Sequence, residues 1–267
     1  MMPLVIAGIG ICATGMANWA QARLILLSDG SPKLDPLPRL APDCLPPVER
    51  RRANATTRLA VSAAMQAVEG LAPEDVEQLA TVFSSSDGDG EVLASMLAAL
   101  AQPQVVLSPT LFHNSVFNAP SGYWSIGSRS QAASITVCAG AASFAAGLKE
   151  AQAEVRATGR AVLYVACDAP FPAALASFVR GALPFACALR LVPAAEAVPG
   201  HGGSIDLSTR EPNLQVPEIP VTELQGRFSG NAAADALPLL LCIAARRRAR
   251  IALPWLDGSR LWLDYQP

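Results

Sequence analysis

Apolar runs alternate with helical patterns along most of this chain. The run LVIAGIGIC at residues 4–12 carries no polar side chain, which is typical of a strand covered on both faces of a sheet. Further strands are predicted at residues 79–86, 132–137, 161–168 and 183–192. Because helical segments separate most of these strands, the pattern predicts an α/β fold in which helices layer onto a sheet through crossovers.

Helical spacing identifies the segments that cover the sheet. Residues 50–70 place a row of small apolar side chains on one face, namely Leu59, Ala60, Ala63, Ala64 and Ala67. A helix from about residue 16 is expected to stop at Gly30, and one that follows residues 87–90 is expected to bury Met96, Leu97 and Leu100. Residues 31–48 contain six prolines and predict an irregular surface segment.

The last part of the chain differs in composition and periodicity. Residues 193–230 are rich in proline and glycine and show little periodicity, apart from a predicted strand at SIDLS. A helix at residues 234–248 and two strands joined by an Asp257-Gly258 turn follow. We therefore expect a main domain at residues 1–192 and a shortened part at residues 193–267 packed on the same fold.

Composition limits the possible classes of protein. Of the 267 residues, 51% are hydrophobic and 16% are charged, which predicts a large core. The net charge of −2 gives no general attraction to nucleic acid or to anionic lipid, so neither is expected as a partner. The longest apolar helical segment, residues 236–245, is about half the ~20 residues that a membrane span needs.

Six cysteines are spread along the chain without a CxxC pair or a cysteine–histidine spacing. This pattern is typical of a reduced cytoplasmic protein without a zinc site, and no metal or cofactor is expected. The glycines of GIGICATG lack the GxGxxG spacing of a nicotinamide site and are better explained by the backbone of a strand exit. Asp87, Asp89 and Glu91 lack the remaining ligands of a calcium loop, so helix capping by Asp87 or Asp89 is the simpler explanation.

Cys138 is the main candidate for chemistry. It lies where a predicted strand passes into a helix, and the unpaired N–H groups and dipole of a helix N-terminus would favour a thiolate there. A nucleophilic thiol also needs a base or a cation beside it. The chain has two histidines, His113 and His201, and either is a possible partner. The alternative is that Cys138 is a small packed residue with an inert thiol.

Three segments together resemble the N-terminal half of a β-ketoacyl synthase of the thiolase-like fold. They are LVIAGIGICATG, SPTLFHNSVFNAPSGYWSIG and SITVCAGAASFAAGLKEA, in this order. Cys138 falls at the position of that family's nucleophile. The second segment is most similar to short synthase-like proteins encoded with aryl-polyene and type II polyketide pathways. The resemblance implies a thiolase-like fold of helix–sheet–helix layers with a truncated C-terminal half.

The departures from the family decide the expected function. Condensing enzymes of this family draw two histidines and a glycine-rich closing motif from their C-terminal half, and this chain shows neither. The resemblance therefore implies a chain-length factor, the inactive partner of a full-length synthase, which shapes the acyl tunnel at their shared interface. In the family, the strand before the cysteine meets its partner across a two-fold axis, so residues 132–137 are expected at that interface. Expected tunnel or interface residues are Phe112, Asn114, Phe117, Asn118, Tyr123 and Trp124; ordinary core packing is the alternative for the rings.

A basic run at residues 244–250 offers a second expected contact. Arg246, Arg247 and Arg248 end a predicted helix, where solvated cations complement the helix dipole. They are also candidates for docking an acyl carrier protein. Two other functions remain open: an autonomous acyltransferase or thioesterase in which Cys138 works with His113, and a scaffold that only stabilises a synthase.

Overall fold

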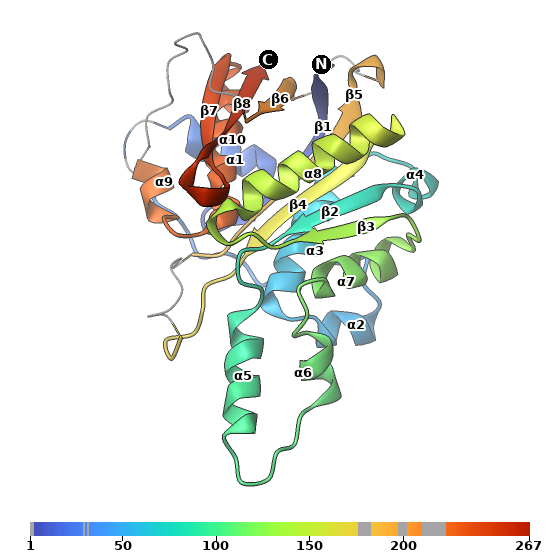
Figure 1. Ribbon diagram of the computed structural model, residues 1–267, viewed down its shortest axis with the longest axis vertical. Coiled ribbons are helices and arrows are strands. Elements are labelled where there is room, and N and C mark those ends of the chain that lie inside the picture. Colours follow the sequence, from blue (N-terminus) through green and yellow to red (C-terminus); the bar gives the residue numbers. More distant parts are fainter. Residues whose placement is uncertain (1–2, 29, 31, 176–182, 197–201, 210–222) are drawn as a thin grey trace.

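One mixed sheet organises the protein. The computed structural model describes residues 3–28, 30, 32–175, 183–196, 202–209 and 223–267, and within them eight strands pair in the order β3-β2-β4-β5-β1-β6-β8-β7 (Figure 1). The strands are β1 (Leu4–Ala13), β2 (Ala80–Ser84), β3 (Ser134–Val137), β4 (Val162–Asp168), β5 (Phe185–Pro193), β6 (Ser204–Ser208), β7 (Ala249–Pro254) and β8 (Arg260–Gln266). The helices are α1 (Trp19–Leu26), α2 (Pro47–Arg52), α3 (Ala55–Ala67), α4 (Pro73–Glu77), α5 (Gly90–Leu100), α6 (Pro109–His113), α7 (Ala119–Ser128), α8 (Ser143–Thr158), α9 (Glu223–Arg227) and α10 (Leu237–Ala245).

Helices cover both faces of this sheet, as the alternation of apolar runs predicted. On β4, Val162 and Tyr164 belong to the core beneath α8, whereas Leu163 and Val165 belong to the core beneath α3. Successive side chains of a strand point to opposite faces, so α3 and α8 form the two outer layers. The expected order of helix, sheet and helix is confirmed.

Strand direction gives the sheet two distinct regions. β2 pairs in parallel with both β3 and β4, while β5 is antiparallel to β4 and to β1. The carboxyl ends of β2, β3 and β4 therefore meet at one edge of the sheet. β3 is the outermost strand on this side and β7 is the outermost on the other.

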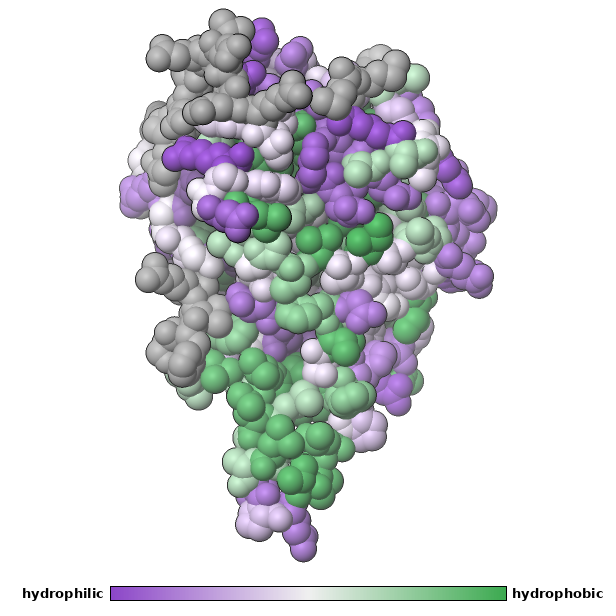
Figure 2. Space-filling model, in the orientation of Figure 1, coloured by the Kyte–Doolittle hydropathy of each residue, from purple (hydrophilic) through white to green (hydrophobic). Residues whose placement is uncertain are grey.

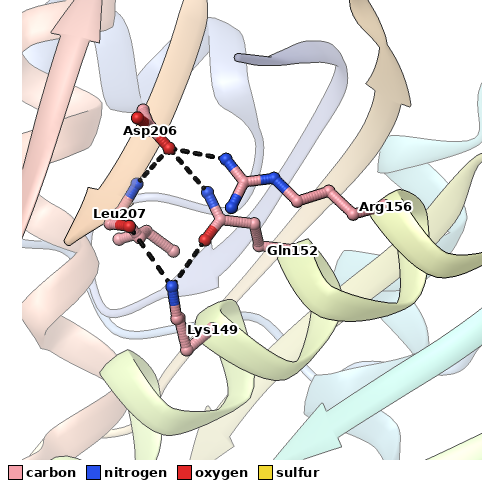
Figure 3. Close-up of polar contacts among 5 residues, drawn as sticks. All are labelled: Lys149, Gln152, Arg156, Asp206 and Leu207. Carbon is pink, nitrogen blue, oxygen red and sulfur yellow. Dashed lines mark hydrogen bonds and ion pairs between the residues drawn. The ribbon is translucent and has the colours of Figure 1, made fainter. Parts of the chain in front are cut away.

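The last part of the chain extends the same sheet. β6 pairs with β1 and with β8, and β7 pairs with β8, so the predicted strand at SIDLS and the final hairpin are confirmed. Asp257 and Gly258 form the turn with φ angles of 57° and 73°. The structure also links β6 to α8 by a polar network of Lys149, Gln152, Arg156, Asp206 and Leu207 (Figure 3).

Two predicted helices begin or end elsewhere. The single helix expected at residues 50–70 is wrong: α2 and α3 are separated at Ala53 and Asn54, both with extended ψ angles. Asn54 caps α3 by accepting a hydrogen bond from the Thr57 N–H at 2.7 Å, and such capping offsets the break. The first helix ends at Leu26, before the expected stop at Gly30.

Glycines in β1 allow α3 to approach the sheet closely. A Cβ at Gly8 or Gly10 would collide with the carbonyl oxygen of Ala67 or Ala63, respectively. Both glycines lie inside β1 and not at its exit, where they were expected, and their lack of a side chain allows α3 to pack closely on the strand. In the acidic segment at residues 87–91, Asp89 caps α5 by accepting a hydrogen bond from the Val92 N–H at 3.0 Å, which confirms the predicted helix cap.

α5 and α6 project from the body of the protein (Figure 1). The prediction that α5 buries Met96, Leu97 and Leu100 is wrong, because Leu97 is 47% exposed, Leu100 is 52% exposed and Met96 is only half-buried. The helical periodicity is present, but no layer formed by the described residues covers that apolar face. None of the described helices combines the length and hydropathy that crossing a bilayer requires.

Candidate functional site

The carboxyl ends of β2, β3 and β4 bring a polar cluster together around Asp168. This side chain is 6% exposed. One carboxylate oxygen accepts hydrogen bonds from the Ser85 hydroxyl (2.8 Å), the Ser86 N–H (2.7 Å) and the Ser86 hydroxyl (3.0 Å), and the other accepts from the Ala233 N–H (3.0 Å). Burial raises the pKa of Asp168, and these donors partly offset the rise.

Cys138 lies at this cluster, immediately after β3. Its thiol donates a hydrogen bond to the carbonyl oxygen of Ser86 at 3.1 Å. The Ser143 hydroxyl lies 3.1 Å from the carbonyl oxygen of Ser85 and accepts from the Ala139 N–H at 2.9 Å, which fixes the turn after Cys138. The predicted strand-to-helix position of Cys138 is confirmed.

The electrostatic surroundings of the thiol differ from the prediction. A short 3-10 turn, Gly140–Ala142, stands between Cys138 and the first residue of α8, Ser143. Burial raises the pKa of Cys138, the Gly140 backbone lowers it, and the carboxylates of Asp87 and Asp168 raise it. The net shift of the Cys138 pKa is therefore upward, the direction opposite to the one expected from a helix N-terminus.

Among the residues that the structure describes, no histidine is hydrogen-bonded to Cys138. His113 is exposed, and its ring packs against Tyr123 in a T-shaped contact with centroids 5.6 Å apart. The hydrogen bonds and ring contacts of the described residues do not join His113 to Cys138. The other expected candidate, His201, lies outside the described residues.

The aromatic segment divides into core and surface. Tyr123 and Trp124 have no exposed area and pack in the core beneath α3, which is the ordinary packing considered as the alternative. Phe112 is 63% exposed and Phe117 is 44% exposed. The Phe117 ring also covers Gly88, whose N–H donates to the Ser85 hydroxyl, so this ring lies at the same edge as the cluster.

The two asparagines of that segment have structural contacts. Asn114 is 6% exposed and donates from Nδ2 to the carbonyl oxygen of Arg52 at 2.8 Å, which ties α6 to α2. Asn118 is exposed and precedes α7, where its carbonyl oxygen accepts from the Ser121 hydroxyl at 2.9 Å. Of the expected tunnel or interface residues, Phe112, Phe117 and Asn118 thus present side chains at the surface.

The three arginines lie where the sequence placed them. Arg246, Arg247 and Arg248 are exposed and follow directly after α10. The Arg246 and Arg247 N–H groups donate to the carbonyl oxygens of Ile243 and Cys242 and close the helix end. None of the hydrogen bonds and charge interactions of Cys138 and Asp168 among the described residues involves these arginines.

Sequence reasoning missed Asp168 and Asn231. Asn231 lies in the last part of the chain and donates from Nδ2 to the carbonyl oxygens of Asp168 (3.1 Å) and Leu183 (2.9 Å). Polar residues at the ends of the apolar runs, Ser85 and Ser86 after β2 and Asp168 in β4, were a usable signal, because neighbouring parallel strands end at one edge. No pattern in the sequence pointed to Asn231.

Comparison with solved structures places the fold among ketosynthases. A chain of the complex of the ketosynthase ApeO with its chain length factor ApeC, from Xenorhabdus doucetiae, has a TM-score of 0.72 and 23% identity, with 100% of both chains covered. A chain of the ishigamide ketosynthase/chain length factor has a TM-score of 0.75 and 13% identity, with 99% of each covered. The ketosynthase from module 6 of the Bacillus subtilis 168 bacillaene synthase has a TM-score of 0.67 and 11% identity; 99% of this chain covers 70% of that one. At these identities the likeness concerns the fold.

The family follows from the sequence match. No curated protein matches the chain at a significant level. The model of the beta-ketoacyl synthase N-terminal domain matches residues 17–247, which runs across the expected boundary at residue 192 and includes Cys138, Asp168 and Asn231. The chain therefore belongs to the family of the beta-ketoacyl synthase N-terminal domain.

Proposed function

We propose that this chain is the chain-length factor of a heterodimeric β-ketoacyl synthase: it shapes the acyl tunnel at the interface and leaves the condensation to its partner. The observation that carries the proposal is an exposed apolar surface on α5, α6 and the adjoining loops. Its members are 43% to 79% exposed, and we call them the α5–α6 surface: Leu93, Leu97, Leu100, Val105, Val106, Phe112, Val116 and Phe117. Figure 2 shows hydrophobic residues gathered on this projection.

The composition of this surface suits a protein partner. Residues 92–128 contain no Asp, Glu, Lys or Arg. The centre of a protein–protein interface is poor in charge and rich in aromatic side chains. Monomeric proteins rarely expose an apolar patch of this extent, so a partner is expected to cover it.

The edge of β3 supports the same proposal. The carbonyl oxygens of Ala133 and Val137 bond to β2 on one side of the strand. Because backbone groups alternate along a parallel strand, those of Ser134 and Thr136 face away from β2 and are open to another chain. Pairing across this edge would complete the interface strand expected at residues 132–137.

The surroundings of the Cys138 thiol favour a subunit that leaves the condensation to its partner. A condensing cysteine needs a neighbour that takes its proton or stabilises its thiolate. Here the thiol bonds to a backbone carbonyl, and its nearest charges are carboxylates. Two of the similar structures are titled as ketosynthases with a chain length factor, and this proposal extends that arrangement to the present chain.

Co-expression with a full-length ketosynthase tests the proposal. We expect a stable 1:1 complex that Leu97→Glu weakens by on the order of tenfold or more, because it buries a charge in an apolar contact. Thr136→Pro should also weaken the complex, since it blocks the open edge of β3 without removing a bond to β2. Leu24→Glu is the matched control, because Leu24 is 75% exposed on α1, away from this surface. A wild-type chain that joins two acyl units without any partner would refute the proposal.

Tunnel shaping and scaffolding are separated by product length. Ala119 is 4% exposed, so enlarging it would overpack the core. Phe112 and Phe117 are better positions, because their rings are already at the surface. Phe117→Ala in the complex should lengthen the products if this chain shapes the tunnel, whereas a pure scaffold predicts unchanged products.

An autonomous acyltransferase or thioesterase is the second candidate, favoured only by the exposure of Cys138. It predicts that the isolated chain becomes acylated at Cys138 when incubated with acyl thioesters, as read by mass spectrometry. We expect no acylation beyond that of a Cys138→Ala control.

We also propose that Arg246, Arg247 and Arg248 dock an acyl carrier protein. They form an exposed cationic cluster after α10, and one similar structure is titled as a ketosynthase complex with a type II acyl-carrier protein. Replacing all three arginines with alanine should lower carrier affinity at low salt and flatten its salt dependence. Unchanged affinity would leave them as a solvated helix end.

A further inference from the structure

One cavity is lined by none of the residues of the cluster around Asp168 and Cys138. It has a volume of about 320 Å³ and lies among α1, the end of α10, β1 and β8. Its apolar and aromatic lining includes Ile9, Trp19, Ile243 and Tyr265. Cavities that bind small molecules begin at about this size, and the walls of this one are about half polar and half apolar.

Two arginines from separate helices line this cavity. Arg23 lies in the last turn of α1, and Arg246 follows α10. In the part of the chain that the structure describes, neither guanidinium group has an ion pair or a side-chain hydrogen bond. Both side chains are exposed, so they present positive charge to an anion at this cavity.

The backbone at Arg246 adds an independent observation. Arg246 has φ 50° and ψ 44°, the left-handed conformation that helix ends usually assign to glycine. An arginine is uncommon at such a position, because a Cβ crowds the backbone there. The unusual feature at this position is therefore the identity of the side chain, because the left-handed backbone itself is common at helix ends.

We propose that this cavity binds a small ligand that carries a phosphate group and an aromatic or apolar portion. The guanidinium groups of Arg23 and Arg246 hold the phosphate, since arginine matches phosphate with paired hydrogen bonds. Trp19 and the aliphatic side chains of Ile9 and Ile243 take the apolar portion. The inference does not rest on the proposed chain-length-factor function, because it concerns a free ligand and the isolated chain.

A structural role for these arginines predicts a different outcome. Cations at helix C-termini complement the helix dipole without any ligand. Arg129 serves as the matched control, because it also follows a helix, is exposed and has φ 57°, yet it lies at another groove, beside Gly127 and Glu77.

Isothermal titration of the wild-type chain with adenosine 3′,5′-bisphosphate at 150 mM salt tests the proposal. We expect saturable 1:1 binding, with pyrophosphate and adenosine each binding more weakly than the bisphosphate. Arg23→Gln and Arg246→Gln should each raise Kd by about tenfold or more, the loss expected for one charge-assisted contact. Arg129→Gln should leave Kd unchanged. Absence of saturable binding in the wild type, or an equal loss in Arg129→Gln, would overturn the proposal.

Arg246→Gly separates binding from folding. Glycine relieves the left-handed backbone, so this variant should melt at the same temperature as the wild type or higher, as should Arg129→Gly. Only Arg246→Gly should lose affinity for the bisphosphate. A stable Arg246→Gly chain that binds as tightly as the wild type would refute a role for this side chain.

Discussion

The surroundings of Cys138 disfavour the thiolate. Burial raises the pKa of the thiol most, the Gly140 backbone lowers it, and the carboxylates of Asp87 and Asp168 raise it further. We predict that alkylation of Cys138 by iodoacetamide has a pH midpoint above that of glutathione, because only the thiolate reacts. Peptide-resolved mass spectrometry from pH 6 to pH 10 measures it. A midpoint below that of glutathione would show an activated thiol and would favour the autonomous enzyme.

A second titrating group lies behind the same cluster. Burial and the charge of Asp168 raise the pKa of Asp235 from its ordinary value of 3.8 to about 7. The folded chain therefore holds a proton that the unfolded chain has lost, so its stability falls as pH rises from about 4 to about 7. We predict that Asp235→Asn raises the free energy of unfolding at pH 8 by about 1 kcal/mol or more and has little effect at pH 4, since one pKa unit is worth about 1.4 kcal/mol. Urea titrations at both pH values measure this, with exposed Asp35→Asn as the control; a gain that is equal at both pH values would contradict it.

At the scale of elements, the sequence predicted strands better than helix exposure. The strands at residues 161–168 and 204–208 were found because apolar runs and alternation are local patterns. Helical periodicity could not show whether α5 faces a layer of this chain or another protein, since both need the same apolar face. The position of Cys138 was also a local pattern, whereas the carboxylates that act on its thiol and the contact between Asn231 and Asp168 depend on packing between distant segments.

The network between α8 and β6 gives a prediction at this scale. Asp206 accepts hydrogen bonds from Gln152 at 3.0 Å and Arg156 at 2.7 Å, while Lys149 donates to the carbonyl oxygen of Leu207 (Figure 3). Asp206→Ala should lower the free energy of unfolding by about 1–2 kcal/mol, because it removes the acceptor shared by buried Gln152 and half-buried Arg156. Chemical denaturation measures the loss. Asp35→Ala, in a pair whose side chains are 90% and 78% exposed, should cost less than about 0.5 kcal/mol. Equal losses would show that the network adds nothing to the attachment of β6.

At the scale of the whole molecule, the charge-free α5–α6 surface should govern self-association of the isolated chain. Without a partner, apolar side chains such as Leu97 and Phe112 gain by covering one another, so we predict concentration-dependent association in sedimentation velocity. Leu97→Glu should raise the monomer fraction because association would then desolvate a carboxylate. Its melting temperature should stay within a few degrees of the wild type, since Leu97 is 47% exposed and contributes little to the core. Leu24→Glu adds the same charge on α1 and should leave association unchanged. If both variants reduce association equally, net charge would be the cause, and the α5–α6 surface would not be the site of self-association.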